Sequence, residues 1–138
     1  MERRNAYYKL LKSMDANGFI QEDFDWNKIL DGADWFHFTG ITPALGDNVV
    51  EITLDAVKTA KEMGLTVSCD LNYRKNLWKY GKKACEVMRE LARYVDVAIA
   101  NEEDCEKVFG IKPENFDVTK DGTEMAASKY RSVCEQLY

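Results

Sequence analysis

The sequence predicts an α/β fold: part of a doubly wound, Rossmann-like, three-layer parallel sheet with a helix at each end of the chain. Two observations lead to this prediction. Short apolar runs alternate along the chain with longer segments whose apolar residues recur at helical spacing. The helical segments are long enough to act as crossovers, so the strands that they connect are expected to be parallel, with right-handed connections.

Six elements are expected in the middle of the chain. Strands are predicted over residues 34–38, 65–70 and 95–100, and helices over residues 47–63, 79–94 and 102–109. In the first helix Ile52 and Ala56 share the apolar face, and Gly64 ends the helix. Asn101 is a suitable N-cap for the last helix, and Gly110 is a suitable stop.

The whole chain, residues 1–138, is expected to form a single partial domain. Its parts are an N-terminal helical segment over residues 1–23, an α/β core over residues 24–110, and a loop with a C-terminal helix over residues 111–138. Amphipathic patterns place the two terminal helices at residues 2–14 and 124–138. Because a helix in an alternating series normally returns to a strand, the sequence predicts that this chain is part of something larger.

Composition argues against several classes of protein. The net charge of −5, with basic and acidic residues interspersed, argues against nucleic-acid binding. No apolar run approaches the roughly 20 residues that span a bilayer, so no membrane association is expected. The first residues lack the apolar stretch of a secretory signal, which predicts a cytoplasmic protein.

The four cysteines do not have the spacing of metal ligands, and His37 is the only histidine. A structural zinc site is therefore not expected. Cys105 lies near a predicted helix N-terminus, a position that lowers a thiol pKa. Its spacing provides no partner, so a structural role is favoured. His37 is expected to be packed and hydrogen-bonded, and Trp26, Trp35 and Trp78 are expected in the core or in packing between subdomains.

Polar residues follow the predicted strands, where open α/β sheets bind their ligands. The second strand leads into Asp70-Leu71-Asn72-Tyr73-Arg74, and the third leads into Asn101-Glu102-Glu103-Asp104. The guanidinium of Arg74 can hold a carboxylate or phosphate at two points. The sequence therefore predicts an anion site at the carboxyl edge of the sheet.

Each candidate also has a structural interpretation. Asn72 can act as a turn residue, and Asp70 as an orienting or capping residue, a structural role being favoured. Thr39-Gly40-Ile41 either lets a ligand approach the backbone closely or turns the chain ahead of Pro43. Acidic residues at the start of the helix over 102–109 are favoured by the helix dipole without any function.

Several motifs in combination resemble those of the ribokinase-like carbohydrate kinases, the PfkB family, and within it the 2-keto-3-deoxygluconate kinases. The matching segments are Phe24-Asp25-Trp26, residues 34–45, Asp70-Leu71-Asn72-Tyr73-Arg74 with Leu77-Trp78, and Asn101-Glu102-Glu103-Asp104 running into Val108-Phe109-Gly110. The resemblance covers a little over half of the chain and corresponds to the middle of a kinase, so residues 24–110 are expected to form a ribokinase-like core. Residues 1–23 diverge from the family.

The resemblance implies phosphoryl transfer from ATP to a hydroxyl of 2-keto-3-deoxygluconate or a similar acid sugar, with Mg²⁺ present. It places the sugar near Thr39, Gly40, Ile41, Asn72 and Arg74, and the phosphates near Asn72, Tyr73, Arg74, Asn101 and Asp104. Asn101 and Asp104 would hold magnesium weakly, through water. Asp104 stands where the family has a glutamate, one methylene longer.

The Gly-Ala-Gly-Asp-like motif that carries the family's catalytic aspartate does not occur in these 138 residues, and the N-terminal glycine pair and the sugar-covering strands are also missing. Three hypotheses follow. The chain is a kinase-derived domain that is inactive alone, a non-catalytic interaction or structural module that forms a homo-oligomer, or a weak ligand-binding domain that keeps the anion site.

Overall fold

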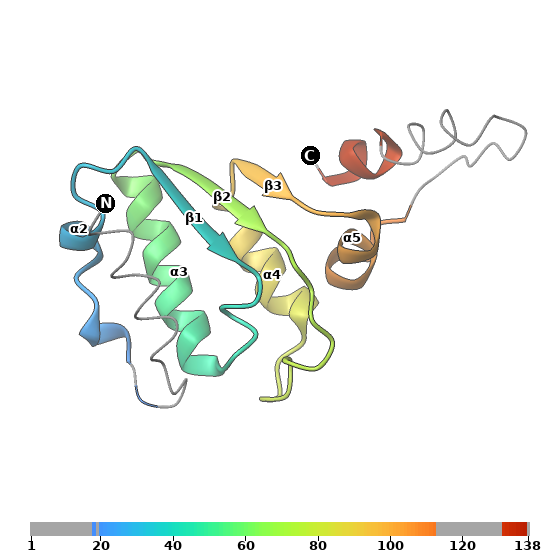
Figure 1. The fold of residues 1–138 in the computed structure, drawn as a ribbon, viewed down its shortest axis with the longest axis horizontal. Coiled ribbons are helices and arrows are strands. Elements are labelled where there is room, and N and C mark those ends of the chain that lie inside the picture. The colour runs from blue at the N-terminus through green and yellow to red at the C-terminus, as the bar shows by residue number, and fades with distance from the viewer. Residues whose placement is uncertain (1–17, 19, 113–130, 138) are drawn as a thin grey trace, which may run out of the picture.

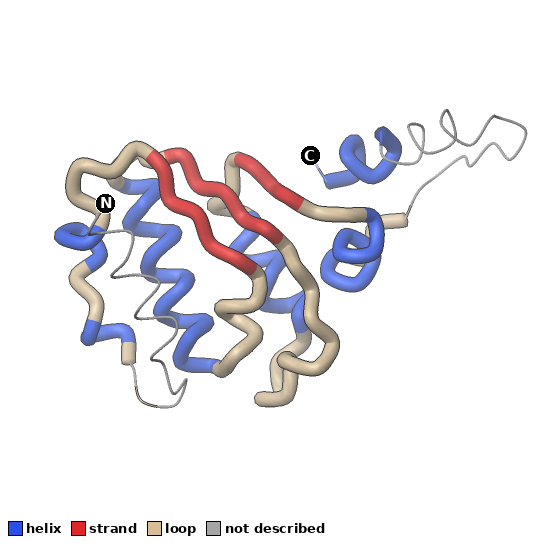
Figure 2. Tube along the Cα trace, viewed as in Figure 1, coloured by secondary structure: helices blue, strands red, loops and turns tan. Residues whose placement is uncertain are grey.

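The computed structural model describes residues 18, 20–112 and 131–137, and within them it contains one parallel sheet of three strands (Figures 1 and 2). The strands are β1 (Trp35–Thr39), β2 (Thr66–Asp70) and β3 (Val97–Ile99), in the order β1-β2-β3. The predicted α/β class and the parallel pairing are confirmed. Each predicted strand exists, with ends that differ by at most two residues.

The helices alternate with the strands as predicted. They are the short turns η1 (Gln21–Asp23) and α2 (Trp26–Ile29), then α3 (Asp47–Glu62), α4 (Ala84–Ala92) and α5 (Glu102–Phe109), and a helix over residues 131–137. The 131–137 helix falls within the predicted C-terminal helix, whose first residues lie outside the described part. The predicted helix over residues 2–14 also lies outside it. None of the described helices is both long and apolar enough to cross a membrane.

Capping residues set the ends of α5 as the sequence indicates. The Asn101 side chain accepts a hydrogen bond from the backbone N–H of Asp104, which satisfies a donor that the first turn leaves free. Gly110 ends the helix in the left-handed conformation, with φ of 74°.

Helix α4 begins five residues later than predicted. Gly81 has a positive φ of 96°, which interrupts a right-handed helix, and Lys83 is still extended. The side chains of Val87, Met88 and Leu91 follow the predicted helical spacing and are buried. The apolar pattern therefore located the helix, while the backbone at Gly81 decided where it begins.

Helices α3 and α4 lie on the same face of the sheet (Figure 1). Alternate strand residues point to this face, among them the buried Phe36 and Phe38 of β1 and Val67 and Cys69 of β2. They form the core with the apolar sides of the two helices. The opposite face of the sheet carries exposed side chains of β1 and β3.

Two features of burial were not evident from the sequence. All three residues of β3 are exposed, because β3 is an edge strand and has no neighbour on its outer side in the described part. Trp35 is 56% exposed, whereas Trp26 is buried in a row of stacked and edge-on rings with Phe24 and Phe36. The side chain of Trp35 points away from α3 and α4 because it alternates with Phe36.

A carboxylate joins three elements at the amino end of the sheet. Asp96 accepts hydrogen bonds from the backbone N–H of Val67 at 2.8 Å and from Nζ of Lys61, at the end of α3, at 2.7 Å. The backbone N–H of Asp96 in turn donates to Val67 O. The Lys61 ammonium, and then the Val67 N–H, hold the pKa of Asp96 below its usual value.

We expect the Asp96 contribution to stability to be lost in acid. A carboxylate whose pKa is lower in the folded chain stabilises it above the unfolded pKa, near 4, and loses this effect as the pH falls through the folded pKa. Asp96→Asn should therefore unfold at lower urea concentration than the wild type at pH 7, and the difference should shrink below about pH 4. Glu62→Gln, an exposed carboxylate next to Lys61, is the control. An Asp96→Asn difference that persists unchanged at pH 3 would contradict this.

Candidate functional site: the carboxyl edge of the sheet

Three loops leave the carboxyl ends of the strands and are tied to one another by backbone hydrogen bonds. Gly40 N–H, after β1, donates to Asp70 O at 2.8 Å, and Leu71 N–H, after β2, donates to Ile99 O at 2.9 Å. The parallel register aligns Thr39 with Asp70 and Asp70 with Ile99. The loops that carry the predicted site residues therefore begin side by side at one edge.

Gly40 is required by the backbone of the neighbouring loop. A Cβ on Gly40 would lie 2.1 Å from the carbonyl oxygen of Leu71, far inside contact distance. The close approach at Gly40 is thus between two protein segments. The hydroxyl of Thr39 accepts from the backbone N–H of Ile41 at 3.4 Å, which supports the turn that follows.

The loop after β2 presents the predicted anion-binding residues. Asn72 has a positive φ of 41°, a conformation that asparagine adopts more readily than most residues. Arg74 is exposed, and its Nη1 donates to the carbonyl of Tyr73 at 3.4 Å. Within the described part of the chain the guanidinium has no carboxylate within salt-bridge distance, so it remains available to an anion.

Asp104 joins the second loop to the third. Its Oδ1 accepts a hydrogen bond from the backbone N–H of Tyr73 at 3.0 Å, while its own N–H is capped by Asn101 at 2.8 Å. These contacts bring Tyr73, Asn101 and Asp104 together, as the sequence predicts for one site. Asn101 and Asp104, the predicted metal ligands, thus also hold the two loops together.

Asn101 and Asp104 do not form a complete shell of direct ligands for a magnesium ion. Magnesium takes about six oxygen ligands in a strict octahedron, usually from carboxylates, water and substrate phosphate. The amide oxygen of Asn101 and one carboxylate oxygen of Asp104 are engaged within the fold. In residues 20–112 and 131–137, no three His, Cys, Asp or Glu side chains are grouped as metal ligands would be.

A second set of contacts, which the sequence pattern did not indicate, holds the loop before α4 against the loop after β1. The Tyr80 hydroxyl donates to Pro43 O, and Lys82 pairs with Asp47 at the start of α3. Burial, with a smaller contribution from Asp47, raises the pKa of Tyr80 to about 12, so the hydroxyl keeps its proton and remains a donor. No local motif marks such a contact, because its partners lie more than 30 residues apart.

Other titratable groups have structural environments. Burial raises the pKa of Cys105, the opposite of what a helix N-terminus alone would do, and nearby acidic groups add to the effect. Burial also raises the pKa of Cys69 to about 12. Both thiols are therefore protonated at neutral pH and are poor nucleophiles. His37 Nδ1 lies 2.8 Å from Ser68 Oγ, which confirms a hydrogen-bonded histidine, although its side chain is exposed.

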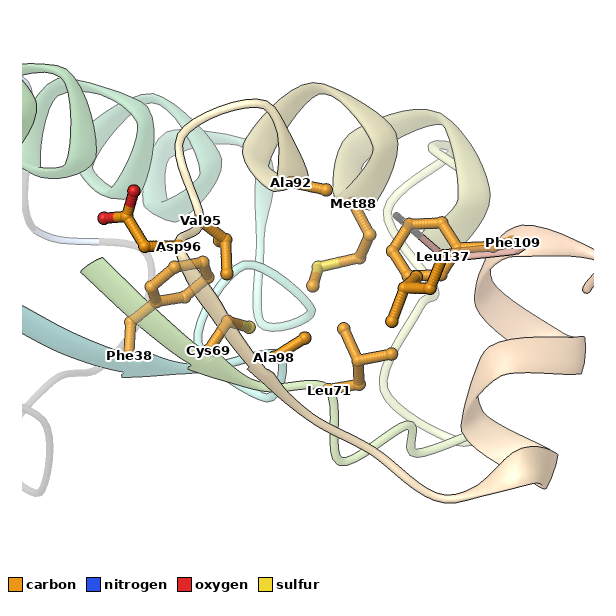
Figure 3. Close-up of a pocket in the computed structure, with 10 residues that line it drawn as sticks. All are labelled: Phe38, Cys69, Leu71, Met88, Ala92, Val95, Asp96, Ala98, Phe109 and Leu137. Atoms are coloured by element: carbon orange, nitrogen blue, oxygen red, sulfur yellow. The ribbon is translucent and has the colours of Figure 1, made fainter. Parts of the chain in front are cut away.

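A cavity of about 230 Å³ lies under the helix-covered face, separate from Arg74 (Figure 3). Its walls come mostly from apolar side chains of the sheet, α4, α5 and the 131–137 helix. Asp96 also borders it, but Figure 3 shows its carboxylate pointing away. The cavity does not suit a phosphate or an acid sugar, because no charged group is directed into it.

The chain was compared with protein families and with known proteins. The family model described as pfkB family carbohydrate kinase matches residues 10–133. The 2-dehydro-3-deoxygalactonokinase of Haloferax volcanii is 42% identical over 83 residues, which are 59% of this chain and 25% of that protein.

Solved structures give the same result. A 2-dehydro-3-deoxygluconokinase from Thermotoga maritima is 49% identical, with a TM-score of 0.74, over 89% of this chain and 34% of that one. A PfkB family carbohydrate kinase from Listeria grayi is 28% identical, with a TM-score of 0.60, over 78% of this chain and 32% of that one. The chain therefore spans about a quarter to a third of the length of these relatives.

We expect Gly40→Ala to destabilise the fold strongly. The new methyl group would meet a backbone carbonyl that cannot swing aside, and overpacking of this kind costs about 1–3 kcal/mol. Gly46→Ala is the matched control, because its Cβ would meet only the side-chain oxygen of Asn48. Urea unfolding measures both. Equal, small losses of stability would show that the Gly40 approach is relaxed in solution.

We also expect Asp104 to protect the Tyr73 amide. Asp104→Ala removes the acceptor, so the Tyr73 N–H should exchange with solvent faster, whereas Asp104→Asn keeps an acceptor oxygen and should exchange at close to the wild-type rate. Hydrogen exchange followed by NMR measures this for a single amide. Unchanged exchange in Asp104→Ala would mean that the two loops are held together by other contacts.

Proposed function

The chain belongs to the pfkB family of carbohydrate kinases, and from this premise we propose that it forms the part of a sugar kinase that holds acid-sugar and phosphate groups at the carboxyl edge of the sheet. The proposed reaction is transfer of a phosphoryl group from ATP to a hydroxyl of 2-dehydro-3-deoxygluconate, which is the same compound as 2-keto-3-deoxygluconate, or of a similar acid sugar. Two relatives whose names contain such sugars support the substrate class.

One observation carries the proposal. The guanidinium of Arg74 is exposed at the edge where three loops meet and has no carboxylate partner in the described part of the chain. An arginine forms two parallel hydrogen bonds to a carboxylate or a phosphate. An acid sugar and ATP together offer both groups.

Phosphoryl transfer relies mainly on positioning and on stabilising charge. In this proposal Arg74 binds the anion and offsets its charge. Asn72 and the Tyr73–Asp104 contact fix the loop that carries Arg74, and Thr39, Gly40 and Ile41 form the adjoining wall. ATP would contribute its phosphates to this edge. Asn101 and Asp104, each with one oxygen engaged within the fold, would hold magnesium only weakly and through water.

We propose further that the chain as given does not catalyse transfer alone. The 138 residues contain no Gly-Ala-Gly-Asp-like motif to supply a general base. General acid–base catalysis contributes about 10²–10⁴-fold, and a base must lie within hydrogen-bond reach of the hydroxyl that it deprotonates.

The four free cysteines are consistent with a reducing, cytoplasmic environment.

The interaction-module alternative has an observation of its own. The face of the sheet opposite α3 and α4 carries exposed apolar side chains, and large exposed apolar surfaces mark contact sites. This alternative does not require the anion site to bind anything. It predicts a chain that associates but does not bind ATP or an acid sugar.

Calorimetric titration distinguishes the two. We expect the wild type to bind ATP or 2-dehydro-3-deoxygluconate weakly, and Arg74→Ala to weaken this binding at least about tenfold, because charged hydrogen bonds contribute about 1.5–3 kcal/mol. Arg93→Ala, which removes an exposed arginine after α4, should bind like the wild type.

A coupled assay should show no kinase turnover. Turnover at rates usual for a kinase would refute the proposed inactivity, and absence of binding would favour the module.

A further inference from the structure

Two loops that leave the same edge of the sheet are joined a second time, beyond the strand ends. We call residues 40–46, between β1 and α3, the first loop, and residues 71–83, between β2 and α4, the second loop (Figure 1). In the proposed function the start of the first loop adjoins the ligand, and the second loop carries Arg74. The contacts that fix one loop against the other therefore decide the shape of the site.

Each loop is closed on itself by turns. At the first loop, the backbone N–H of Thr42 donates to Thr39 O at 3.0 Å. In the second loop, the backbone N–H of Leu77 donates to Arg74 O at 3.1 Å. Such hydrogen bonds restrict the backbone within a turn. The placement of one loop relative to the other consequently depends on the contacts between them.

Backbone and carboxylate contacts hold the second loop at its start. The carbonyl of Leu71 lies against Gly40. Two residues later, the backbone N–H of Tyr73 donates to Asp104. Both contacts are made before the chain reaches Arg74. A segment that is held only at this end could pivot about it, so the position of Arg74 also depends on what holds the far end.

Tyr80 holds the far end of the second loop. Its hydroxyl donates to the carbonyl oxygen of Pro43, a fully buried residue of the first loop. The ring centroids of Tyr80 and Trp78 lie 6.1 Å apart, with 31° between the ring planes. Burial, and then Asp47, raise the pKa of Tyr80 to about 12, so the hydroxyl keeps its proton at neutral pH. Because a buried carbonyl without a partner costs free energy, the Tyr80–Pro43 contact is favoured.

The neighbouring ion pair is a weaker tie. Lys82 pairs with Asp47 at the start of α3, but the two side chains are 41% and 63% exposed. Exposed ion pairs contribute little to stability, because water competes for both partners and salt screens their charges. The Tyr80 hydroxyl meets a buried carbonyl instead. It is therefore the contact on which the join between the far ends of the two loops depends.

We propose that Tyr80 is a positioning residue of the candidate site, and that it sets the separation between Arg74 and the wall formed by residues 39–41. This role rests on the proposed function, because it concerns the same site. It matters for a ligand that touches both loops. An acid sugar is such a ligand, since its carboxylate can bind Arg74 while its hydroxyls face the wall. Inorganic phosphate needs Arg74 alone.

NMR titration of the chain with 2-dehydro-3-deoxygluconate and with inorganic phosphate tests this role, because it measures weak binding residue by residue. In the wild type we expect the sugar to shift the amide signals of residues 39–41 and 72–74. Phosphate should shift those of residues 72–74 alone. A sugar that shifts only residues 72–74 would overturn the role of Tyr80, since the wall would then not be part of the sugar site.

Tyr80→Phe keeps the ring and removes only the hydroxyl that binds Pro43. We expect it to weaken sugar binding about threefold to tenfold, because the sugar must then order the two loops itself. Phosphate binding should stay within about twofold of the wild type, since phosphate contacts one loop. Tyr94→Phe is the matched control, because the half-buried Tyr94 packs against the core. It should bind both ligands like the wild type.

The ratio of the two affinities separates positioning from stability. A partly unfolded variant loses sugar and phosphate binding in the same proportion, whereas displaced loops affect the sugar alone. If Tyr80→Phe binds the sugar as tightly as the wild type, or loses both ligands in proportion, the role of Tyr80 is overturned and the anion site stands. A wild type that binds neither ligand would refute the proposed function, and the role of Tyr80 with it.

Discussion

The parallel direction of the three strands is the constraint on which the rest of this structure depends. Because β1, β2 and β3 follow one another in space in the same order as in the sequence, their right-handed crossovers place α3 and α4 on the same face. The same direction brings all three strand-end loops to one edge. One topological fact thus produces the core, the candidate site and the uncovered face opposite α3 and α4.

The two ends of the sheet are held in different ways. At the amino end, a single carboxylate, Asp96, satisfies the Val67 N–H and the Lys61 ammonium. At the carboxyl end the ties are mostly backbone contacts, through Gly40 and Leu71, with the Asp104 carboxylate joining the last loop. Side chains at the carboxyl edge, such as Arg74, are consequently left free to meet a ligand.

The sequence was most informative where local chemistry decides structure. Helices α3 and α5 begin and end within a residue of their predicted bounds, because Gly64, Asn101 and Gly110 act through their own backbone or through a neighbour three residues away. The strands were predicted from short apolar runs, which are also a local property of the sequence.

Features that depend on distant partners could not be predicted. A single sequence does not tell whether β3 has a neighbour on its outer side, so its exposure was missed. It also does not tell that a carbonyl of Leu71 lies against Gly40. The sequence pattern predicted that the loops of the candidate residues share one edge of the sheet, and they do. The structural use of Asp104 became visible only when its partner, the Tyr73 N–H, could be located.

This dual use affects how the carboxyl edge is interpreted. If Asn101 and Asp104 acted only on a ligand, their side chains would be expected to lack partners within the chain. Instead each satisfies a backbone donor, and the second contact fixes the loop that carries Arg74. A ligand anion at Arg74 would then bind a loop that is already held in place, which reduces the entropy lost on binding. Asp104 can thus contribute to anion binding through position, without touching the anion.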